Sequence, residues 1–155
     1  NFLNKTGVRT FEAAAYLRRN GADIVRVRKM FRDKMEEFKA RAEAVRDAEV
    51  FENSFAIGVC PADGLESPTV TGAQAANELL NIVGVRASIV LTEYNGRIYV
   101  SARSIDDVNV QVIMEKMGGG GHLNMAGVQL ECTLEEAMQQ VRDTLDCMFE
   151  KGELE

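Results

Sequence analysis

One motif decides how this chain folds: ASIVLTEYNGRIYVSARS, residues 87–104. Two runs rich in β-branched and aromatic residues flank the dipeptide Asn95-Gly96. This dipeptide tolerates the positive φ angles that a type I′ turn requires, and such turns join adjacent antiparallel strands. The motif therefore predicts a β-hairpin with a two-residue loop.

The short loop also fixes which residues of the hairpin face one another. Tyr94 is expected opposite Arg97, and Ser88 opposite Arg103. Side chains alternate between the two faces of a strand, so Ser101 and Arg103 are expected on one face.

Strand-like and helical segments alternate on both sides of the hairpin. The elements expected around it are a strand at 54–60, a helix at 71–83, a helix at 110–117, a strand at 128–132, and a final helix that starts at the capping box Thr133/Glu136 and ends at Phe149. Interleaving of this kind predicts an α/β fold, with a mixed β-sheet flanked by helices.

The first 46 residues differ from the remainder in charge. They carry a net charge of +6, whereas residues 47–155 carry −12. A helix is expected at 9–20, and apolar residues at steps of three and four from Ile24 to Val45 predict one further helix of about 22 residues, roughly 33 Å long. We interpret 1–46 as an N-terminal helical connector and 47–155 as a separate domain. The apolar stripe of the connector would pack against a preceding domain or drive formation of a homodimer.

Composition excludes several classes of protein. With 46% hydrophobic residues in 155, the chain is expected to form a soluble core and no fibre. The longest stretch without charged residues, 117–130, contains glycines and a histidine and is a poor membrane span. Three widely spaced cysteines fit a reducing compartment, and we expect the cytoplasm. Because the chain begins at Asn1, we expect it to be part of a longer protein.

A run of four glycines, Gly118 to Gly121, immediately precedes His122, the only histidine. Each glycine costs roughly 0.5–1 kcal/mol relative to alanine, so a function is expected to compensate. Glycines allow main-chain N–H groups to converge on an anion, and the imidazole could donate to a phosphate. A flexible connector, a plain helix cap and a buried histidine are the structural alternatives. A metal role for His122 lacks ligands at short spacing.

The segment Ser101-Ala102-Arg103-Ser104 ends the hairpin and offers hydroxyl and guanidinium groups to a phosphate. Arg103 could instead pair with a carboxylate. Only the helix at 110–117 separates this segment from the glycines, so both could bind one ligand. The acidic character of residues 47–155 favours a small anion over a long nucleic acid.

These residues resemble the DHHA1 domain of the DHH phosphoesterase superfamily, which is marked by Ser-x-Arg-Ser and a later Gly-Gly-Gly-His. Here the two motifs are 101–104 and 119–122, followed by Ala126-Gly127. The resemblance spans essentially all 155 residues. In detail, the sequence is similar to the GdpP type of bacterial cyclic-di-AMP phosphodiesterase. Met125 departs from that pattern, because it replaces the first alanine of Ala-Ala-Gly.

The resemblance implies a division of labour in a longer enzyme. A DHH domain upstream of residue 1 would hold two Mn²⁺ ions, and residues 47–155 would bind the substrate. The full-length protein would hydrolyse cyclic di-AMP to pApA, whereas this chain would have no catalytic residue and no cofactor and would bind without hydrolysis. Carried over by position, the substrate-binding residues are Ser101, Arg103, Ser104, Gly119, Gly120, Gly121 and His122.

The resemblance also implies the partners and the location. The expected partners are a cyclic dinucleotide or another short nucleotide, the upstream DHH domain and a second copy of the chain. The parent protein would be anchored in the cell membrane, with this part in the cytoplasm and without membrane contact. Two alternatives stay open: an oligoribonuclease or RecJ-like exonuclease, and a non-catalytic RNA-binding or dimerisation module, which the basic connector would suit.

Overall fold

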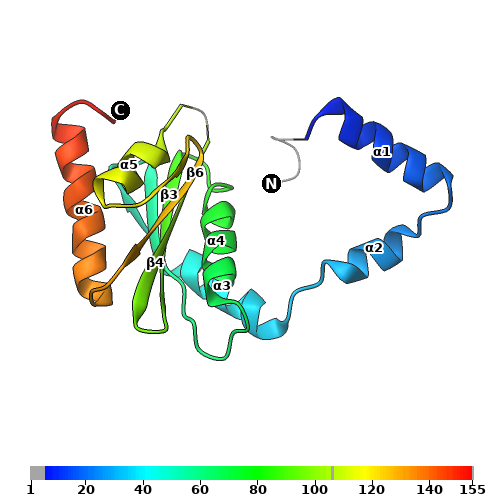
Figure 1. Cartoon of the computed structure of the whole chain (residues 1–155), viewed down its shortest axis with the longest axis horizontal. Coiled ribbons are helices and arrows are strands. Elements are labelled where there is room, and N and C mark those ends of the chain that lie inside the picture. The colour runs from blue at the N-terminus through cyan, green and yellow to red at the C-terminus, as the bar shows by residue number, and fades with distance from the viewer. Residues whose placement is uncertain (1–5, 106, 155) are drawn as a thin grey trace. The chain divides into compact units, whose positions relative to one another are not determined.

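A computed structural model describes residues 6–105 and 107–154 of the chain. The chain divides into two compact units, residues 1–34 and 35–155 (Figure 1). Within the described residues, the first unit contains α1 (Val8–Arg19) and α2 (Ile24–Met30). The second unit contains α3 (Met35–Arg46), β1 (Glu49–Phe51), β2 (Phe55–Val59), α4 (Pro68–Leu79), β3 (Ala87–Tyr94), β4 (Arg97–Ser104), α5 (Val110–Lys116), β5 (Gly120–His122), β6 (Met125–Leu130) and α6 (Leu134–Glu150).

The strands of the second unit form a single mixed sheet in the order β1-β2-β3-β4-β6-β5. All neighbouring pairs are antiparallel except β2 and β3, which are parallel and joined through α4. The expected hairpin is confirmed to the residue, with Tyr94 opposite Arg97 and Ser88 opposite Arg103. Asn95 and Gly96 both have positive φ angles, 51° and 71°. The predicted α/β class with helices flanking a mixed sheet is therefore confirmed.

Two hydrophobic cores lie on opposite faces of the sheet. On one face, α3 and α4 cover β2 and β3, and the buried residues are Ala40, Ala44, Ala56, Cys60, Ala75, Ala76, Leu79, Val85 and Val90. On the other face, α5 and α6 cover a larger core centred on Ile89, Leu91, Ile98, Val100, Ile113, Met114, Val141 and Leu145. Because side chains alternate along β4, Ser101 and Arg103 face the layer of α3 and α4, whereas Val100 and Ala102 face the layer of α5 and α6.

Helix α4 packs very closely on β3 at Gly72. A Cβ atom added to Gly72 would lie 2.2 Å from Oγ1 of Thr92, which is only 1% exposed. The hydroxyl of Ser88, on the same face of β3, donates to the carbonyl of Ala76 at 2.6 Å. The absence of a side chain at Gly72 therefore allows α4 to approach the sheet closely, and the buried hydrogen bond from Ser88 stabilises this contact.

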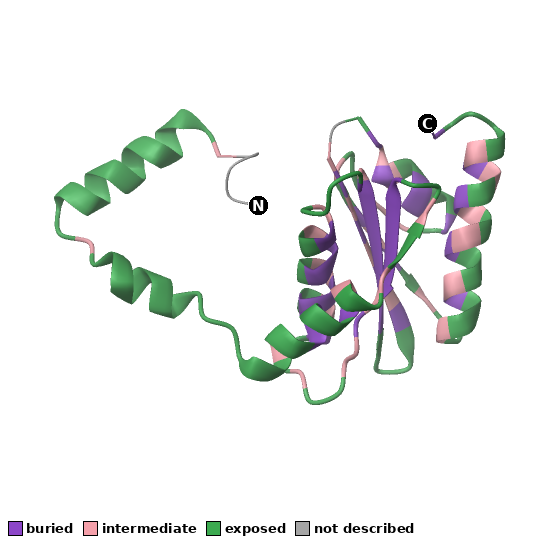
Figure 2. Cartoon of the chain, turned by 180° about the vertical axis from the view of Figure 1, so that it is seen from behind, coloured by how far each residue is buried: buried purple, intermediate pink, exposed green. Residues whose placement is uncertain are grey.

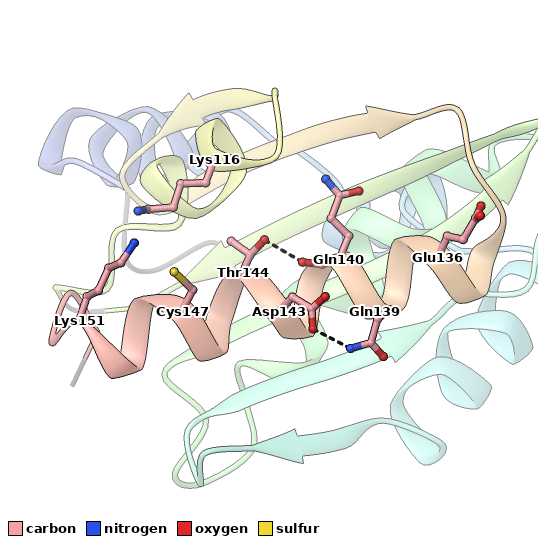
Figure 3. Close-up of a pocket in the computed structure, with 8 residues that line it drawn as sticks. All are labelled: Lys116, Glu136, Gln139, Gln140, Asp143, Thr144, Cys147 and Lys151. Carbon is pink, nitrogen blue, oxygen red and sulfur yellow. Dashed lines mark hydrogen bonds between the residues drawn. The ribbon is translucent and has the colours of Figure 1, made fainter.

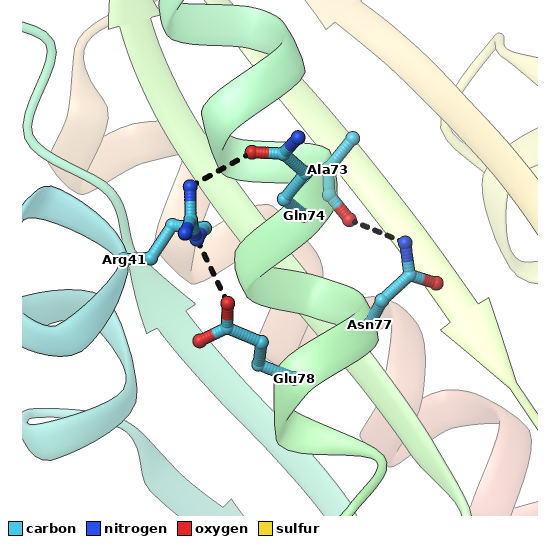
Figure 4. A network of polar contacts seen from close by, with 5 residues as sticks. All are labelled: Arg41, Ala73, Gln74, Asn77 and Glu78. Carbon is cyan, nitrogen blue, oxygen red and sulfur yellow. Dashed lines mark hydrogen bonds and ion pairs between the residues drawn. The ribbon is translucent and has the colours of Figure 1, made fainter. Parts of the chain in front are cut away.

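Arg41 joins α3 to α4 (Figure 4). Its side chain is 5% exposed, and its Nε donates to Oε1 of Glu78 at 2.8 Å. Its Nη1 donates to Oε1 of Gln74 at 3.0 Å. Because charged side chains are seldom buried without partners, this network accounts for the burial of Arg41 and fixes α3 on the domain.

The expected single helix from Ile24 to Val45 is wrong, because α2 ends at Met30 and α3 begins at Met35. Glu36 and Glu37 occupy the first turn of α3, where carboxylates are stabilised by the positive end of the helix dipole, so a new helix start is favoured there. The unit boundary accordingly falls at residue 34 and not at 46, since α3 packs on α4.

The helices of the first unit have no buried residues (Figure 2). Side chains that are usually buried are exposed on both, among them Phe11, Tyr16, Val25 and Met30. In the described part of the chain, no helix has both the length and the apolar character needed to cross a membrane.

Candidate functional site

The sheet brings the two sequence motifs together, because β6 lies between the strand of Ser-Ala-Arg-Ser and the strand of the glycines. Arg103 of β4 lies opposite Met125 of β6, and Met125 lies opposite His122 of β5. Residues directly opposite one another share a face of a sheet. We call these three residues the phosphate row. Two strand spacings separate the Cα atoms of its outer members, roughly 10 Å.

A second row runs parallel to the phosphate row, two residues along each strand. Ser101 lies opposite Gly127, and Gly127 lies opposite Gly120. We call these residues the glycine row. Because strand side chains alternate with a period of two, both rows face the side of the sheet on which α4 packs. The expectation that both motifs could contact one ligand is therefore compatible with the fold.

The guanidinium of Arg103 is half-buried and incompletely paired. Its Nη1 donates to the carbonyl of Ala102 at 2.8 Å, while its buried Nε has no hydrogen-bond partner. Among residues 6–105 and 107–154, no carboxylate forms an ion pair with it, so the carboxylate alternative is not what the structure shows. Burial lowers the pKa of Arg103, but an arginine remains charged at neutral pH. A cation with an unused buried donor is suited to bind an anion.

Half of the glycine run, Gly120 and Gly121, belongs to strand β5 and not to the expected loop. Gly118, with φ of 86°, ends α5, where its N–H donates to the carbonyl of Glu115 and that of Gly119 to the carbonyl of Met114. A Cβ on Gly119 would lie 2.3 Å from the carbonyl oxygen of Gly127. The backbone conformation of Gly118 and the close packing of Gly119 therefore explain why these two positions are glycine.

The other two glycines differ from each other. A Cβ on Gly121 would lie 2.4 Å from the carbonyl oxygen of Met125, so this glycine allows β5 to pack against β6. A Cβ on Gly120 would meet nothing within 4 Å. An added Cβ would also meet nothing at Gly118, but the φ of 86° there already favours glycine. The entropy argument for an anion loop therefore rests on Gly120.

His122 is exposed at the end of β5, which removes the alternative of a buried histidine. Ser104 behaves differently from its neighbours, because it is buried on the opposite face of β4 from Arg103. Its hydroxyl donates to the carbonyl of Val108 at 2.6 Å and accepts from Nδ2 of Asn124 at 3.2 Å. We therefore assign Ser104 to positioning the strand end and the β5–β6 turn.

A cavity of about 410 Å³ adjoins the glycine row. Its lining includes Thr69, Tyr99, Ser101, Gly119, Gly127 and Gln129. Sequence reasoning missed three of these. Tyr99 and Gln129 could have been found from strand register, because Tyr99 lies two residues before Ser101 and Gln129 lies opposite Tyr99. Thr69, in the first turn of α4, has no local signal that links it to the site.

A larger groove, of about 590 Å³, runs along α6 toward α5 (Figure 3). It contains Cys147 between Lys116 and Lys151, and Nζ of Lys116 pairs with Oε2 of Glu153 at 2.8 Å. The groove lies on the layer of α5 and α6, away from both motif rows.

Within the described residues, no group of three or more histidine, cysteine, aspartate or glutamate side chains is arranged to hold a metal ion. We therefore take the two rows and their cavity as the candidate site.

A family model described as the DHHA1 domain matches residues 63–151 of the chain. The chain is 43% identical to the cyclic-di-AMP phosphodiesterase GdpP of Geobacillus thermodenitrificans over 154 residues, covering 98% of this chain and 23% of the relative. It is also 43% identical to the cyclic-di-AMP phosphodiesterase PdeA of Listeria monocytogenes, covering 99% of this chain and 23% of that relative. The chain thus spans about a quarter of the length of these curated relatives.

A solved structure supports the fold. An exopolyphosphatase-related protein from Bacteroides fragilis superimposes with a TM-score of 0.80 and 21% identity, covering 94% of this chain and 45% of the other. At this level of identity the likeness concerns the arrangement of the backbone. It agrees with the mixed sheet and flanking helices described above.

Proposed function

Because the chain belongs to the DHHA1 domain family, we propose that it is the substrate-binding part of a phosphodiesterase that opens cyclic di-AMP to linear pApA. The observation that carries the proposal is the buried, unpartnered Nε of Arg103, in the same row as the imidazole of His122. A phosphate oxygen supplies the acceptor that this guanidinium lacks.

Each residue of the two rows has a distinct task in this proposal. Arg103 and the hydroxyl of Ser101 bind a phosphate group of the substrate, and His122 donates to it from the neighbouring strand end. Gly120 allows the ligand to approach the backbone, since no side chain occupies that space. These contacts bind and orient the dinucleotide but break no bond.

The bond-breaking chemistry is assigned to a DHH domain outside this chain. Two Mn²⁺ ions there would activate water and stabilise the displaced phosphate oxygen, as two-metal sites do. The chain by itself is expected to bind the dinucleotide and not to hydrolyse it. Its partners in this proposal are the substrate and that DHH domain.

Calorimetry tests the binding step. The chain is titrated with cyclic di-AMP, pApA and short single-stranded RNA, and the titrations are repeated with Arg103→Ala and His122→Ala. Charged hydrogen bonds of this kind are worth about 10- to 100-fold in affinity, so Arg103→Ala is expected to weaken cyclic di-AMP binding by at least tenfold. Arg142→Ala, on α6, is the matched control and is expected to bind as the natural chain does.

Two results would contradict the proposal. Affinity that grows with RNA length and exceeds that for cyclic di-AMP would favour an exonuclease or RNA-binding module. Equal binding by the natural chain and Arg103→Ala would remove Arg103 from the site. A separate incubation of the chain with Mn²⁺ and cyclic di-AMP is expected to give no pApA, and product measured by chromatography would refute the assignment of hydrolysis to another domain.

A further inference from the structure

A third row of residues continues the phosphate and glycine rows. Tyr99 of β4 lies opposite Gln129 of β6, two residues along each strand from Ser101 and Gly127. By strand alternation these side chains face the same side of the sheet as Arg103. Each row is displaced from the next by roughly 7 Å along the strands.

The hollow between this third row and the phosphate row is fixed by the backbone. Gly127 forms part of the lining of the cavity, and a Cβ there would lie 2.7 Å from the carbonyl oxygen of Val100. A side chain cannot fill the position without a shift of β4 or β6. The cavity of about 410 Å³ is within the usual size of small-molecule sites, about 300–1,000 Å³.

The chemistry of the cavity differs from that of the phosphate row. All of its lining residues are uncharged, whereas the phosphate row carries Arg103 and His122. Tyr99 offers an aromatic ring, Thr69 a hydroxyl, and Gln129 an exposed amide that has both donor and acceptor atoms. In the part of the chain that the structure describes, no hydrogen bond occupies the Gln129 amide. An uncharged, partly aromatic hollow suits a nucleobase better than a second phosphate.

We propose that this cavity is the base subsite of the nucleotide whose phosphate Arg103 binds, and that Gln129 makes it selective for adenine. The inference rests on the proposed function, since it assumes a nucleotide ligand. A glutamine amide can donate to N7 of adenine and accept from its N6 amino group at the same time. Guanine presents two acceptors, N7 and O6, on the corresponding edge, so the same amide pairs with only one of them. Tyr99 stacks on the base and contributes equally to both purines.

Three ligands separate the base from the phosphate: cyclic di-AMP, cyclic di-GMP and ribose 5-phosphate. Binding to the chain is followed by NMR chemical-shift titration, which detects weak complexes. The natural chain is expected to prefer cyclic di-AMP to cyclic di-GMP by about tenfold, the scale of one bidentate base contact. Gln129→Ala is expected to lose most of this preference and to leave ribose 5-phosphate binding unchanged. Tyr99→Leu is expected to weaken both dinucleotides and to preserve their ratio.

Gln140→Ala is the matched control, because Gln140 is an exposed glutamine on α6, in the layer on the other face of the sheet. The inference fails alone if Arg103→Ala weakens cyclic di-AMP binding while Gln129→Ala leaves the adenine preference intact. It also fails if Gln129→Ala weakens ribose 5-phosphate equally, because Gln129 would then support the fold and not the base. If no ligand depends on Arg103, the inference and the proposed function fall together.

Discussion

Arg41 and Arg103 are withdrawn from solvent in the same unit, yet they differ in what satisfies them. Arg41 lies between α3 and α4, where Glu78 and Gln74 accept from its guanidinium. Arg103 lies on β4, where its buried Nε has no acceptor. A buried charged side chain that is paired within the protein holds elements together. A buried charged side chain with an unused donor is suited to bind an acceptor from outside the chain.

The two arginines mark two ends of one sheet. At the covered end, β2 and β3 are buried on both faces by α3, α4 and the larger core. At the open end, β6 is buried on one face only, β5 contains no buried residue, and Met125, Gln129 and His122 are exposed. The covered end contributes stability, and the open end leaves side chains and backbone accessible to a ligand. Three predictions test this contrast.

The largest difference is expected between two glycines. Gly72→Val at the covered end places branched atoms against Thr92 and should destabilise the chain by about 3 kcal/mol, at the upper end of overpacking costs. At the open end, the Cβ of Gly120→Val would meet no atom within 4 Å, so the free energy of unfolding should change by less than about 0.5 kcal/mol. Urea denaturation followed by circular dichroism measures both. Equal losses would show that the two ends are packed alike.

The thiol of Cys60 reports on the covered end. Burial raises its pKa from 9.0 to about 11, so the thiolate fraction near pH 8 is about a hundredfold below that of an ordinary thiol. Alkylation with iodoacetamide, followed by mass spectrometry, should be slower by at least that factor than for free cysteine. The folded state keeps this proton longer than the unfolded state, so its contribution to stability should decline between about pH 9 and pH 11. Rapid alkylation of Cys60 at pH 8 would mean that α4 opens readily.

A smaller loss of stability is expected for Arg41 at the covered end, and little change for Arg103 at the open end. Arg41→Met removes the hydrogen bonds to Gln74 and to the half-exposed Glu78 and leaves these side chains without that partner, at a cost of about 1–3 kcal/mol. Arg103→Met removes the unpartnered Nε but also the hydrogen bond from Nη1 to Ala102, and the two effects should offset one another to within about 1 kcal/mol. Thermal melting of the two variants makes the comparison. A larger loss for Arg103→Met would indicate that its role is structural.

Local signals were sufficient for much of the fold. Asn95-Gly96 determines the hairpin and its register, and the Thr133/Glu136 capping box marks the start of α6, as the structure confirms. The break between α2 and α3 escaped prediction because the apolar spacing continues across it. Strand β5 was missed because glycine has low β-propensity, and only its packing against β6 explains the conformation.

The candidate site could be predicted only in part. The faces of Ser101 and Arg103 follow from alternation, but Ser104 needs three-dimensional knowledge, because Val108 and Asn124 occupy its hydroxyl. The position of β6 between the two motifs is also a property of topology. The periodicity of the sequence does not tell whether a third strand will lie between the strands that carry the two motifs.

The sheet order has a consequence for the order in which the strands pair during folding. The three strands that carry the rows are contiguous in the chain, within residues 97–130, and all of their pairings are antiparallel. The parallel pairing of β2 with β3 must instead close a long crossover through α4, and closing longer loops costs more entropy before contacts repay it. The half of the sheet that carries the candidate site is therefore expected to form early in folding, and β2 is expected to join it late.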